Sequence, residues 1–481
     1  MRFINILVIL RILSTILFIE TISYLLCLPV AHIFNESPFP FLWSSFITIT
    51  ISVVFFIIAR NAPVKKISIR EGFLSVSLSW LLFTGFGTLP YIFSDTIPTF
   101  IDAFFESASG FTTTGASIVN NVESLPYTIL FWRSLTHWIG GLGIIVLVII
   151  ILPSLRITAQ QLFSLESSLK EKIHPKTKAI GYRLLFIYLG LTVAEIILLK
   201  LGEMNLFESI CHTFGTVATG GFSTKNTSLV NFSPYSQYIV ALFMLLSGVS
   251  FVIYYFIVKL KFKKVLNNEE LWFYLAIILI AGIISTGILL AGSSKTFESA
   301  FREGFFQVIS IITTTGYSTA DFVNWPNAGV LLIFLLLFTG ASTGSTTGSI
   351  KMSRHLLTIK NIKNIFVKLL HPNAITQIKL NEKAVSDRTN ISIISFVLLY
   401  IFIFLIGSVI IVLTGIDPVS SASAVAANLG NVGPGLGIVG PASNYSHMPA
   451  ISKVVFSLLM IIGRLEINTI FIVFARSFWK L

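Results

Sequence analysis

Four short segments rich in glycine, threonine and serine recur along the chain, and their residue types are the ones best suited to chemistry. The first and third read Thr-Thr-Thr-Gly, at 112–115 and 313–316. The second reads Ala-Thr-Gly-Gly-Phe-Ser at 218–223, and the fourth, more diverged, reads Asn-Val-Gly-Pro-Gly-Leu at 431–436. Such segments offer backbone carbonyl and hydroxyl oxygens, which can replace the hydration shell of a bare cation. They therefore indicate an ion pathway.

One register aligns the four segments on a glycine in each, and an acidic residue precedes every glycine at a similar distance. The aligned glycines are Gly115, Gly221, Gly316 and Gly433, and the acids are Asp102, Glu208 and Glu303, each thirteen positions earlier, and Asp417, sixteen positions earlier. We expect each acid near the outer N-terminus of a short helix, where the helix dipole favours a negative charge. The C-terminus of that helix would then stabilise a cation, and the acids would make the outer face negative.

Glycine at the aligned position permits positive φ angles, so successive carbonyl groups can point the same way. The segments themselves contain no charged side chain, so an ion would not be held too tightly to pass. We expect the ion to meet the glycine and the two residues before it in each segment: Thr113, Thr114, Gly115, Thr219, Gly220, Gly221, Thr314, Thr315, Gly316, Asn431, Val432 and Gly433.

The composition places these segments in a membrane protein. The 481 residues are 54% hydrophobic and only 11% charged, whereas an ordinary soluble domain is roughly 25% charged. Long unbroken apolar runs favour helices over the alternating strands of a barrel. Ten stretches approach the roughly 20 apolar residues that cross a bilayer; they lie near 3–28, 41–59, 72–93, 126–152, 181–201, 234–258, 271–292, 326–350, 391–414 and 450–477.

The glycine segments lie in four semi-polar stretches between these spans, near 98–118, 204–224, 296–319 and 417–437. Irregular backbone is tolerated at membrane depth only where protein buries it or water lines it, so we interpret these stretches as re-entrant loops. The sequence therefore predicts an all-α polytopic membrane protein with four pseudo-symmetric helix–pore loop–helix repeats around a central ion pore. The expected units are two extra N-terminal transmembrane helices at 1–59 and repeats at 60–152, 153–258, 259–370 and 371–481.

The distribution of positive charge predicts the orientation. The formal net charge is +12, which in a soluble protein would suggest a nucleic acid partner. Here 22 of the 33 Lys and Arg residues lie in four connecting stretches, at 60–71, 153–183, 259–270 and 351–390. The positive-inside rule makes these stretches cytoplasmic, so the re-entrant loops face outside and both termini lie in the cytoplasm. We expect the chain to contact a lipid bilayer and no nucleic acid.

A polar stretch at 340–351 interrupts an apolar span with three glycines and six serine or threonine residues, which makes a poor helix interior. It could be a kinked helix whose hydroxyls satisfy the backbone. We favour an unwound segment near the cytoplasmic side that obstructs the pore below the filter. The residues expected to form this gate are Gly340, Ser342, Thr343, Gly344, Ser345, Thr346, Thr347, Gly348 and Lys351.

Arg464 lies within an apolar span, where a lone charge is costly and usually faces a partner or water. It could form a structural ion pair, for example with Glu466, or it could face the pore below the filter and raise a barrier to the ion. We favour the pore and count Arg464 among the gate residues. For Arg133 we expect a structural role near the outer interface, and for His137 and His212 structural hydrogen bonds.

Taken together, these motifs resemble those of the membrane subunit of bacterial Trk-type potassium uptake systems, within the Trk/Ktr/HKT superfamily. The matching segments are the four glycine segments, His-Trp-Ile-Gly-Gly-Leu-Gly at 137–143 and Gly-Arg-Leu-Glu at 463–466. The resemblance covers essentially the whole chain. It implies potassium as the transported ion with no organic cofactor, a homodimer in the bacterial inner membrane, an intramembrane gating loop and a cytosolic nucleotide-binding regulatory subunit of the RCK/KTN type. A glycine in all four segments, Gly115 included, implies a preference for potassium over sodium.

Other function classes are weighed against this interpretation. A less selective subunit of the same superfamily, which passes sodium as well as potassium, stays open, as does the question of passive or ion-coupled movement. A secondary transporter for organic solutes would show two related halves instead of four loop units. An intramembrane enzyme would need a nucleophile–base pair, a metal motif or paired acids within spans, and none is evident. We therefore do not expect an enzyme.

Overall fold

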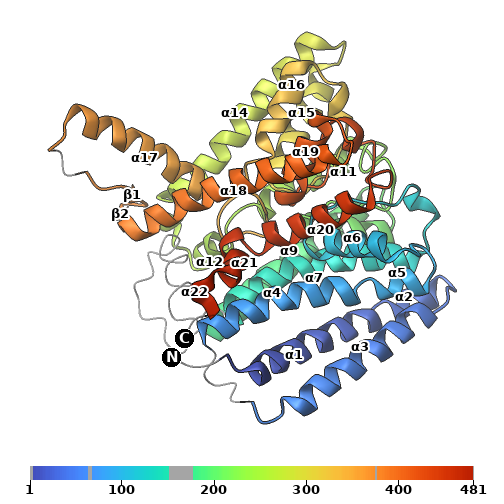
Figure 1. Ribbon diagram of the computed structural model, residues 1–481. Helices are drawn as coiled ribbons and strands as arrows, with labels where there is room; N and C mark the ends of the chain where they lie inside the picture. Colours follow the sequence, from blue (N-terminus) through green and yellow to red (C-terminus); the bar gives the residue numbers. More distant parts are fainter. Residues whose placement is uncertain (1–3, 63–67, 151–176, 374–375, 480–481) are drawn as a thin grey trace.

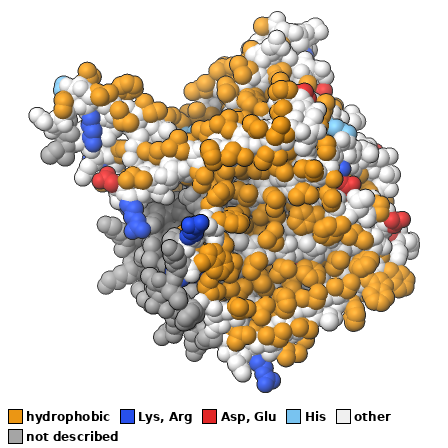
Figure 2. Space-filling model, viewed as in Figure 1, with side chains coloured by type: hydrophobic (Ala, Val, Ile, Leu, Met, Phe, Trp, Pro, Cys, Tyr) orange, Lys and Arg blue, Asp and Glu red, His pale blue; other side chains and the backbone are white. Residues whose placement is uncertain are grey.

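The computed structural model describes residues 4–62, 68–150, 177–373 and 376–479. Most of the basic stretch expected at 153–183 therefore lies outside the described residues. The described part is a bundle of helices that run across the molecule, with α17 projecting from one end (Figure 1). Hydrophobic side chains cover most of the visible face of the bundle, as expected of a surface that contacts lipid (Figure 2).

The long helices are α1 (Ile6–Leu25), α3 (Phe39–Ile58), α4 (Ile69–Phe86), α7 (Tyr127–Ile150), α9 (Thr177–Leu201), α14 (Glu269–Gly292), α17 (Met352–Leu370) and α18 (Asp387–Leu413). Short helices extend or connect them: α2 (Leu28–Ile33), α5 (Leu89–Phe93), α13 (Phe262–Leu266) and α22 (Arg476–Trp479). Three further helices are single turns of 3₁₀ type: η1 (Val122–Ser124), η2 (Phe322–Asn324) and η3 (Gly437–Val439). One small antiparallel hairpin, β1 (Lys379–Leu380) with β2 (Lys383–Ala384), departs from the all-α prediction.

Among the described residues, six helical stretches are long and apolar enough to cross a membrane: Ile6–Ile33, Phe39–Ile58, Arg70–Phe93, Arg183–Leu201, Glu269–Gly292 and Asp387–Leu413. They confirm a helical membrane protein with several spans. α1 and α3 pack as an N-terminal hairpin, in which α1 contacts α4 and α3 contacts α5. α7, at 24 residues, has similar length but carries Arg133 and His137 in its interior.

Three of the predicted continuous spans are broken. The span at 234–258 consists of α11 (Pro234–Ser247) and α12 (Phe251–Val258), bent by 91°. In the span at 326–350 only α16 (Asn327–Leu336) is helical, and the span at 450–477 divides into α20 (Ala450–Arg464) and α21 (Ile467–Phe474).

Two of these breaks satisfy each other's backbone groups. Ser342 N donates to Gly248 O at 3.0 Å, and Phe251 N donates to Gly344 O at 3.1 Å. The polar segment after α16 therefore fills the bend between α11 and α12. This pairing explains why irregular backbone can persist at membrane depth, because the free N–H and C=O groups of each segment form hydrogen bonds with those of the other.

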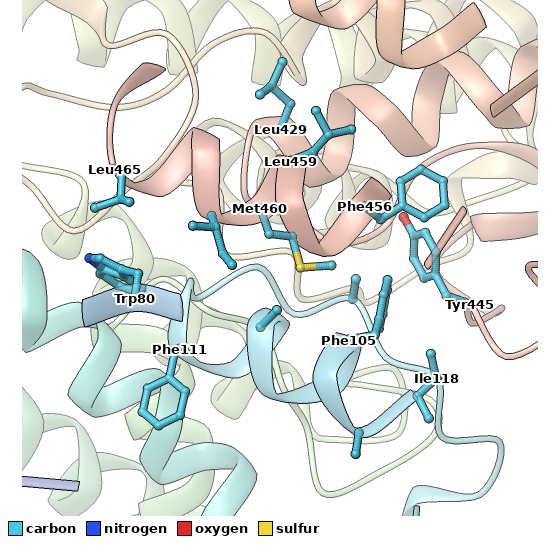
Figure 3. Packing of buried hydrophobic residues seen from close by; sticks show 14 of the residues in the cluster. Trp80, Phe105, Phe111, Ile118, Leu429, Tyr445, Phe456, Leu459, Met460 and Leu465 are labelled. Carbon is cyan, nitrogen blue, oxygen red and sulfur yellow. The ribbon is translucent and has the colours of Figure 1, made fainter. Parts of the chain in front are cut away.

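The hydrophobic core joins the first repeat to the last. Figure 3 shows Tyr445 between Phe105 and Phe456, and Met460 extending from α20 toward the segment that carries Phe105. The ring centroids of Phe105 and Tyr445 lie 5.3 Å apart, and those of Tyr445 and Phe456 lie 5.6 Å apart. Since the chain returns to its first repeat in this way, the four loop units can close into a ring.

Candidate functional site

Each glycine segment follows a short helix that ends four residues before the aligned glycine. These helices are α6 (Phe100–Phe111), α10 (Leu206–Val217), α15 (Phe297–Ile312) and α19 (Pro418–Leu429). We call the segments after them loop 1 (112–118), loop 2 (218–224), loop 3 (313–319) and loop 4 (430–436). In each loop the residue before the glycine donates its N–H to a carbonyl five residues earlier in the helix, at 2.7–2.9 Å. The loops are therefore one backbone motif used four times.

The four loops repeat the same unusual backbone angles. The residue two positions before each glycine has φ between 53° and 57°, and the glycine itself has φ between 79° and 95°. The first set is Thr113, Thr219, Thr314 and Asn431. A left-handed conformation is rare for a β-branched residue and costs of order 1–3 kcal/mol, so it persists only where the surroundings impose it.

The four glycines form a closed ring. An ideal Cβ on Gly115 would lie 2.2 Å from Gly220 O, and one on Gly221 would lie 2.0 Å from Thr315 O. The same construction places Gly316 against Val432 O at 2.0 Å and Gly433 against Thr114 O at 2.5 Å. Each glycine thus touches the carbonyl oxygen one residue before the glycine of the next loop, and loop 4 returns to loop 1. A ring of backbone oxygens of this kind can coordinate a dehydrated cation.

A cavity of about 140 Å³ opens on one side of the ring. Its lining includes all four glycines, together with Ser117, Ser223 and Ser318, each of which lies two residues after its glycine. These serines mark the cavity side of loops 1 to 3, which we call their outer ends because the charge distribution predicts that this side faces outside. The charged side chains of Arg133 and Lys225 also reach the lining.

The acids at the helix starts follow the prediction in three loops. Asp102 lies in the first turn of α6, Glu208 forms a capping box with Asn205, and Asp417 caps α19 by accepting from Ser420 N at 2.9 Å. That hydrogen bond holds the pKa of the exposed Asp417 carboxyl below its ordinary value.

The placement predicted for Glu303 is wrong. α15 is 16 residues long and begins at Phe297 under a Thr296 cap, so its first-turn acid is Glu298 and Glu303 lies in the second turn. Helix α15 is one turn longer than its counterparts, and either acid fits a helix start when only the sequence is known.

The face that carries these acids, which the charge distribution predicts to be the outer one, is less negative than expected because lysines pair with three of the four acids. Lys453 Nζ lies 2.7 Å from Asp102, Lys225 Nζ lies 3.6 Å from Glu208, and Lys295 pairs with Glu303.

The predicted gate segment packs against the other side of the loops. Thr346 Oγ1 accepts from Thr219 Oγ1 at 3.3 Å, and Gly348 N donates to Thr314 Oγ1 at 2.8 Å. A Cβ on Gly348 would lie 2.4 Å from Gly430 O. The segment therefore touches the helix-proximal ends of loops 2, 3 and 4, opposite the cavity.

Within the segment, most of the predicted residues bond to one another or to neighbouring elements. Gly340 N donates to Ile350 O at 2.8 Å, Ser345 Oγ lies 2.9 Å from Thr347 Oγ1, and Lys351 Nζ donates to Thr347 Oγ1 at 2.8 Å. These bonds make the segment a folded loop between α16 and α17, which agrees with an unwound stretch and not with a kinked helix.

Glu270, at the start of α14, is a residue of this region that the sequence analysis missed. Its Oε1 accepts from Thr343 N at 2.7 Å, Thr343 Oγ1 at 2.9 Å and Ser353 N at 3.0 Å. The carboxylate fastens the gate segment to the first turn of α17. An acid at the start of an apolar helix is too common a signal to have identified it.

Arg464 contacts the gate segment and is 4% exposed. Its guanidinium donates to Thr346 O and, at 3.3 Å, to Gly140 O. Glu466 instead pairs with Arg354 at 2.8 Å, so the expected alternative of an Arg464–Glu466 ion pair is wrong.

Arg133, His137 and His212, for which structural roles are expected, each bond to neighbouring elements. Arg133 pairs with Glu106 at 2.8 Å. His137 Nε2 accepts from Phe222 N at 3.1 Å, so its Nδ1 donates to Gly110 O at 2.8 Å. His212 bonds to Glu208 O and, at 3.0 Å, to Ser223 Oγ. We call the four short helices α6, α10, α15 and α19 the pore helices. Both histidines join a pore helix to loop 2.

Comparison with known proteins identifies close relatives of this architecture. A family model named TrkH and described as a cation transport protein matches residues 44–481. The Trk system potassium uptake protein TrkH of Escherichia coli K12 is 37% identical over 420 residues, covering 85% of this chain and 86% of that protein. The protein of the same name from Halomonas elongata is 32% identical over 98% of this chain and 99% of its own length. The crystal structure of the potassium transporter TrkH from Vibrio parahaemolyticus superposes with a TM-score of 0.89 at 31% identity, covering 99% of this chain and all of that one.

Proposed function

The chain belongs to the TrkH family of cation transport proteins, and from this premise we propose that it takes up potassium ions across the bacterial inner membrane. It is a multi-pass membrane transporter and not an enzyme. The observation that carries the proposal is the closed ring in which each glycine touches a carbonyl oxygen of the next loop. Potassium requires such oxygens in place of its hydration water.

In this proposal the ion passes through a filter made by the glycine and the two preceding residues of each loop. The four repeats expected at 60–152, 153–258, 259–370 and 371–481 each supply one loop, and residues 1–59 supply the two additional helices. Support comes from the repeated φ angles, since left-handed residues at alternate positions turn successive carbonyls in a common direction. The short helices add the partial negative charge of their C-termini next to the ion.

The gate would be the segment 340–351 together with Arg464. Its contacts with the helix-proximal ends of three loops support this role, because a segment there stands in the path of an ion that leaves the filter. The guanidinium of Arg464 adds a positive charge to the same place, which raises the barrier for a cation. Opening then requires the segment to leave the bend between α11 and α12.

Assembly is also part of the proposal. α17 projects from the bundle and exposes an apolar stripe at helical spacing, made of Ile359, Ile362, Phe366 and Leu369, each at least 50% exposed. A second copy of the chain would cover this stripe in a homodimer. The resemblance adds a cytosolic nucleotide-binding regulatory subunit, and the basic residues of 351–390 offer it a surface on the side where both termini would lie.

The test is ion flux in vesicles that contain the purified chain, with potassium and sodium compared under varied membrane potential and proton gradient. We expect potassium flux well above sodium flux, and growth rescue of a host without potassium uptake when the regulator is supplied. Equal fluxes would favour a less selective subunit that passes sodium as well as potassium. The absence of both potassium flux and growth rescue would contradict the proposal. Deleting residues 342–347 should raise basal potassium flux, and a folded deletion variant without this rise would contradict the gate.

A further inference from the structure

A buried ion pair lies directly behind the outer ends of loops 1 and 2. Glu106 of α6 is 0% exposed and Arg133 of α7 is 2% exposed. Arg133 Nε donates to Glu106 Oε1 at 2.8 Å. Both residues lie outside the set that forms the glycine ring or the gate segment, so the filter itself does not explain them.

The carboxylate of Glu106 holds the backbone just beyond the glycine of loop 1. Its Oε2 accepts from Ile118 N at 2.9 Å, and its Oε1 accepts from Ser117 Oγ at the same distance. Ser117 lies two residues after Gly115. A single side chain on the pore helix therefore fixes both the hydroxyl and the backbone at the outer end of this loop.

The guanidinium of Arg133 connects loop 1 to loop 2. Its Nη2 donates to Ser117 Oγ at 3.2 Å and its Nη1 donates to Ser223 O at 3.3 Å. The guanidinium carbon also lies 4.1 Å from the centre of the Phe222 ring. Ser223 lies two residues after its glycine, as Ser117 does. The planar group thus spans the same position of two neighbouring loops, which a lysine could not do.

The corresponding positions of the other pore helices hold weaker contacts. Nine residues before the glycine, where α6 has Glu106, α10 has His212, α15 has Gln307 and α19 has Ala424. His212 bonds to Ser223 Oγ at 3.0 Å, and Gln307 Nε2 reaches Ala320 O only at 3.5 Å. The buried Glu106–Arg133 ion pair, which we call the brace, therefore distinguishes loops 1 and 2 from loops 3 and 4.

A buried ion pair is poor evidence for stability, because the cost of removing two charges from water offsets most of their attraction. Such a pair can instead define a geometry, because breaking it leaves an uncompensated buried charge. Here that geometry is imposed on the two chain segments that continue from Gly115 and Gly221.

We propose that Glu106 and Arg133 are positioning residues that hold the outer ends of loops 1 and 2 at the spacing by which the filter discriminates potassium from sodium. The inference rests on the proposed function of the ring. Without these hydrogen bonds, the outer ends of the two loops lose their fixed spacing, and the carbonyl oxygens can then rearrange around a smaller ion. Potassium still passes, but sodium is excluded less well.

The test is the double variant Glu106→Gln/Arg133→Met, which removes both charges together and so avoids a lone buried charge. The full chain is reconstituted in vesicles, and potassium and sodium fluxes are measured at the same driving force. We expect the ratio of potassium to sodium flux to fall about tenfold, which corresponds to about 1.4 kcal/mol, while potassium flux stays within about threefold of wild type. The wild-type potassium flux in the same assay tests the proposed function separately.

The matched control is Glu298→Gln/Arg302→Gln, which neutralises an ion pair of 2.7 Å on the outer part of α15, away from the loops. An unchanged flux ratio in a folded double variant would overturn the proposal, and so would an equal fall in the control. Should the double variant not fold, Arg133→Lys replaces it. This change keeps the charge and loses the bridge to Ser223 O, so the ratio must still fall.

Discussion

Loop 1 and loop 4 reach the same backbone conformation with different supporting side chains. Their left-handed residues, Thr113 and Asn431, have φ of 53° and 54°, and their glycines have φ of 80° and 95°. Loop 1 is held from behind by charges, through Glu106 and Arg133. Loop 4 has Ala424 at the position of Glu106 and is held by neutral groups instead.

The neutral support of loop 4 comes from three side chains. Asn431 Nδ2 donates to Thr114 Oγ1 at 3.0 Å and to Met460 O at 2.9 Å. Ser423 Oγ accepts from Leu436 N at 2.9 Å, and Tyr445 OH donates to Gly433 O at 2.9 Å. The four loops therefore share a backbone shape, while each loop obtains that shape from its own neighbours.

The largest expected effect on ion selectivity comes from serine at the aligned glycines. Gly115→Ser and Gly433→Ser each place a Cβ at positive φ, within 2.2 Å of Gly220 O and 2.5 Å of Thr114 O. We expect each to lower the potassium-to-sodium flux ratio at least about tenfold, equivalent to about 1.4 kcal/mol. Vesicle flux of both ions measures it. If Gly433→Ser left the flux ratio unchanged while Gly115→Ser lowered it, loop 4 would not be equivalent to loop 1.

Among effects on stability the largest is expected for Asn431→Ala, which removes two buried hydrogen bonds and leaves alanine in a left-handed conformation that asparagine tolerates better. We expect the free energy of unfolding to fall by about 2–3 kcal/mol. Its control is Thr113→Ala, since Thr113 Oγ1 has no hydrogen-bond partner among the described residues and threonine is strained there. That control should change stability by less than about 0.5 kcal/mol. Equal losses, measured by denaturant titration in detergent, would remove the distinction between the loops.

Tyr445→Phe should have a smaller effect. It deletes the hydroxyl that donates to Gly433 O and accepts from Asn428 Nδ2, while the aromatic contacts with Phe105 and Phe456 remain. We expect a loss of about 1 kcal/mol in unfolding free energy, measured by the same titration. A loss as large as that of Asn431→Ala would mean that the hydroxyl, and not the amide, is the main support of loop 4.

The smallest effect is expected for Asp417→Asn at the outer start of α19. Asparagine still caps the helix, so only the charge is lost. Because Ser420 N lowers the pKa of Asp417, the native carboxyl stays ionised at neutral pH and below, and it titrates only under its ordinary range. We expect potassium influx at low ionic strength to fall about twofold and the difference to vanish at high salt. A difference that persists at high salt would point to structure instead of charge. Loop 1 offers no such test, because Lys453 already pairs with Asp102.

The membrane class, the number of loop units and the register of their glycines could all be predicted from the amino-acid sequence. These features are local: apolar length, glycine at positive φ and the Thr-Thr-Thr-Gly repeat depend on residues close together in the chain. The sequence also indicated that 340–351 could not be an ordinary helix, because its composition is unfavourable wherever it lies.

The contacts that hold these units together could not be predicted, because they join residues far apart in the chain. The backbone groups at the bend between α11 and α12 find their hydrogen-bond partners in the segment at 340–351, almost one hundred residues away. Arg464 meets Thr346 instead of Glu466, and Arg133 reaches Ser223 across 90 residues. A hydrogen bond requires its donor and acceptor within about 3 Å in a defined direction. Distances between residues so far apart in the chain depend on the assembly of all four loops, so they cannot be read from residue types alone.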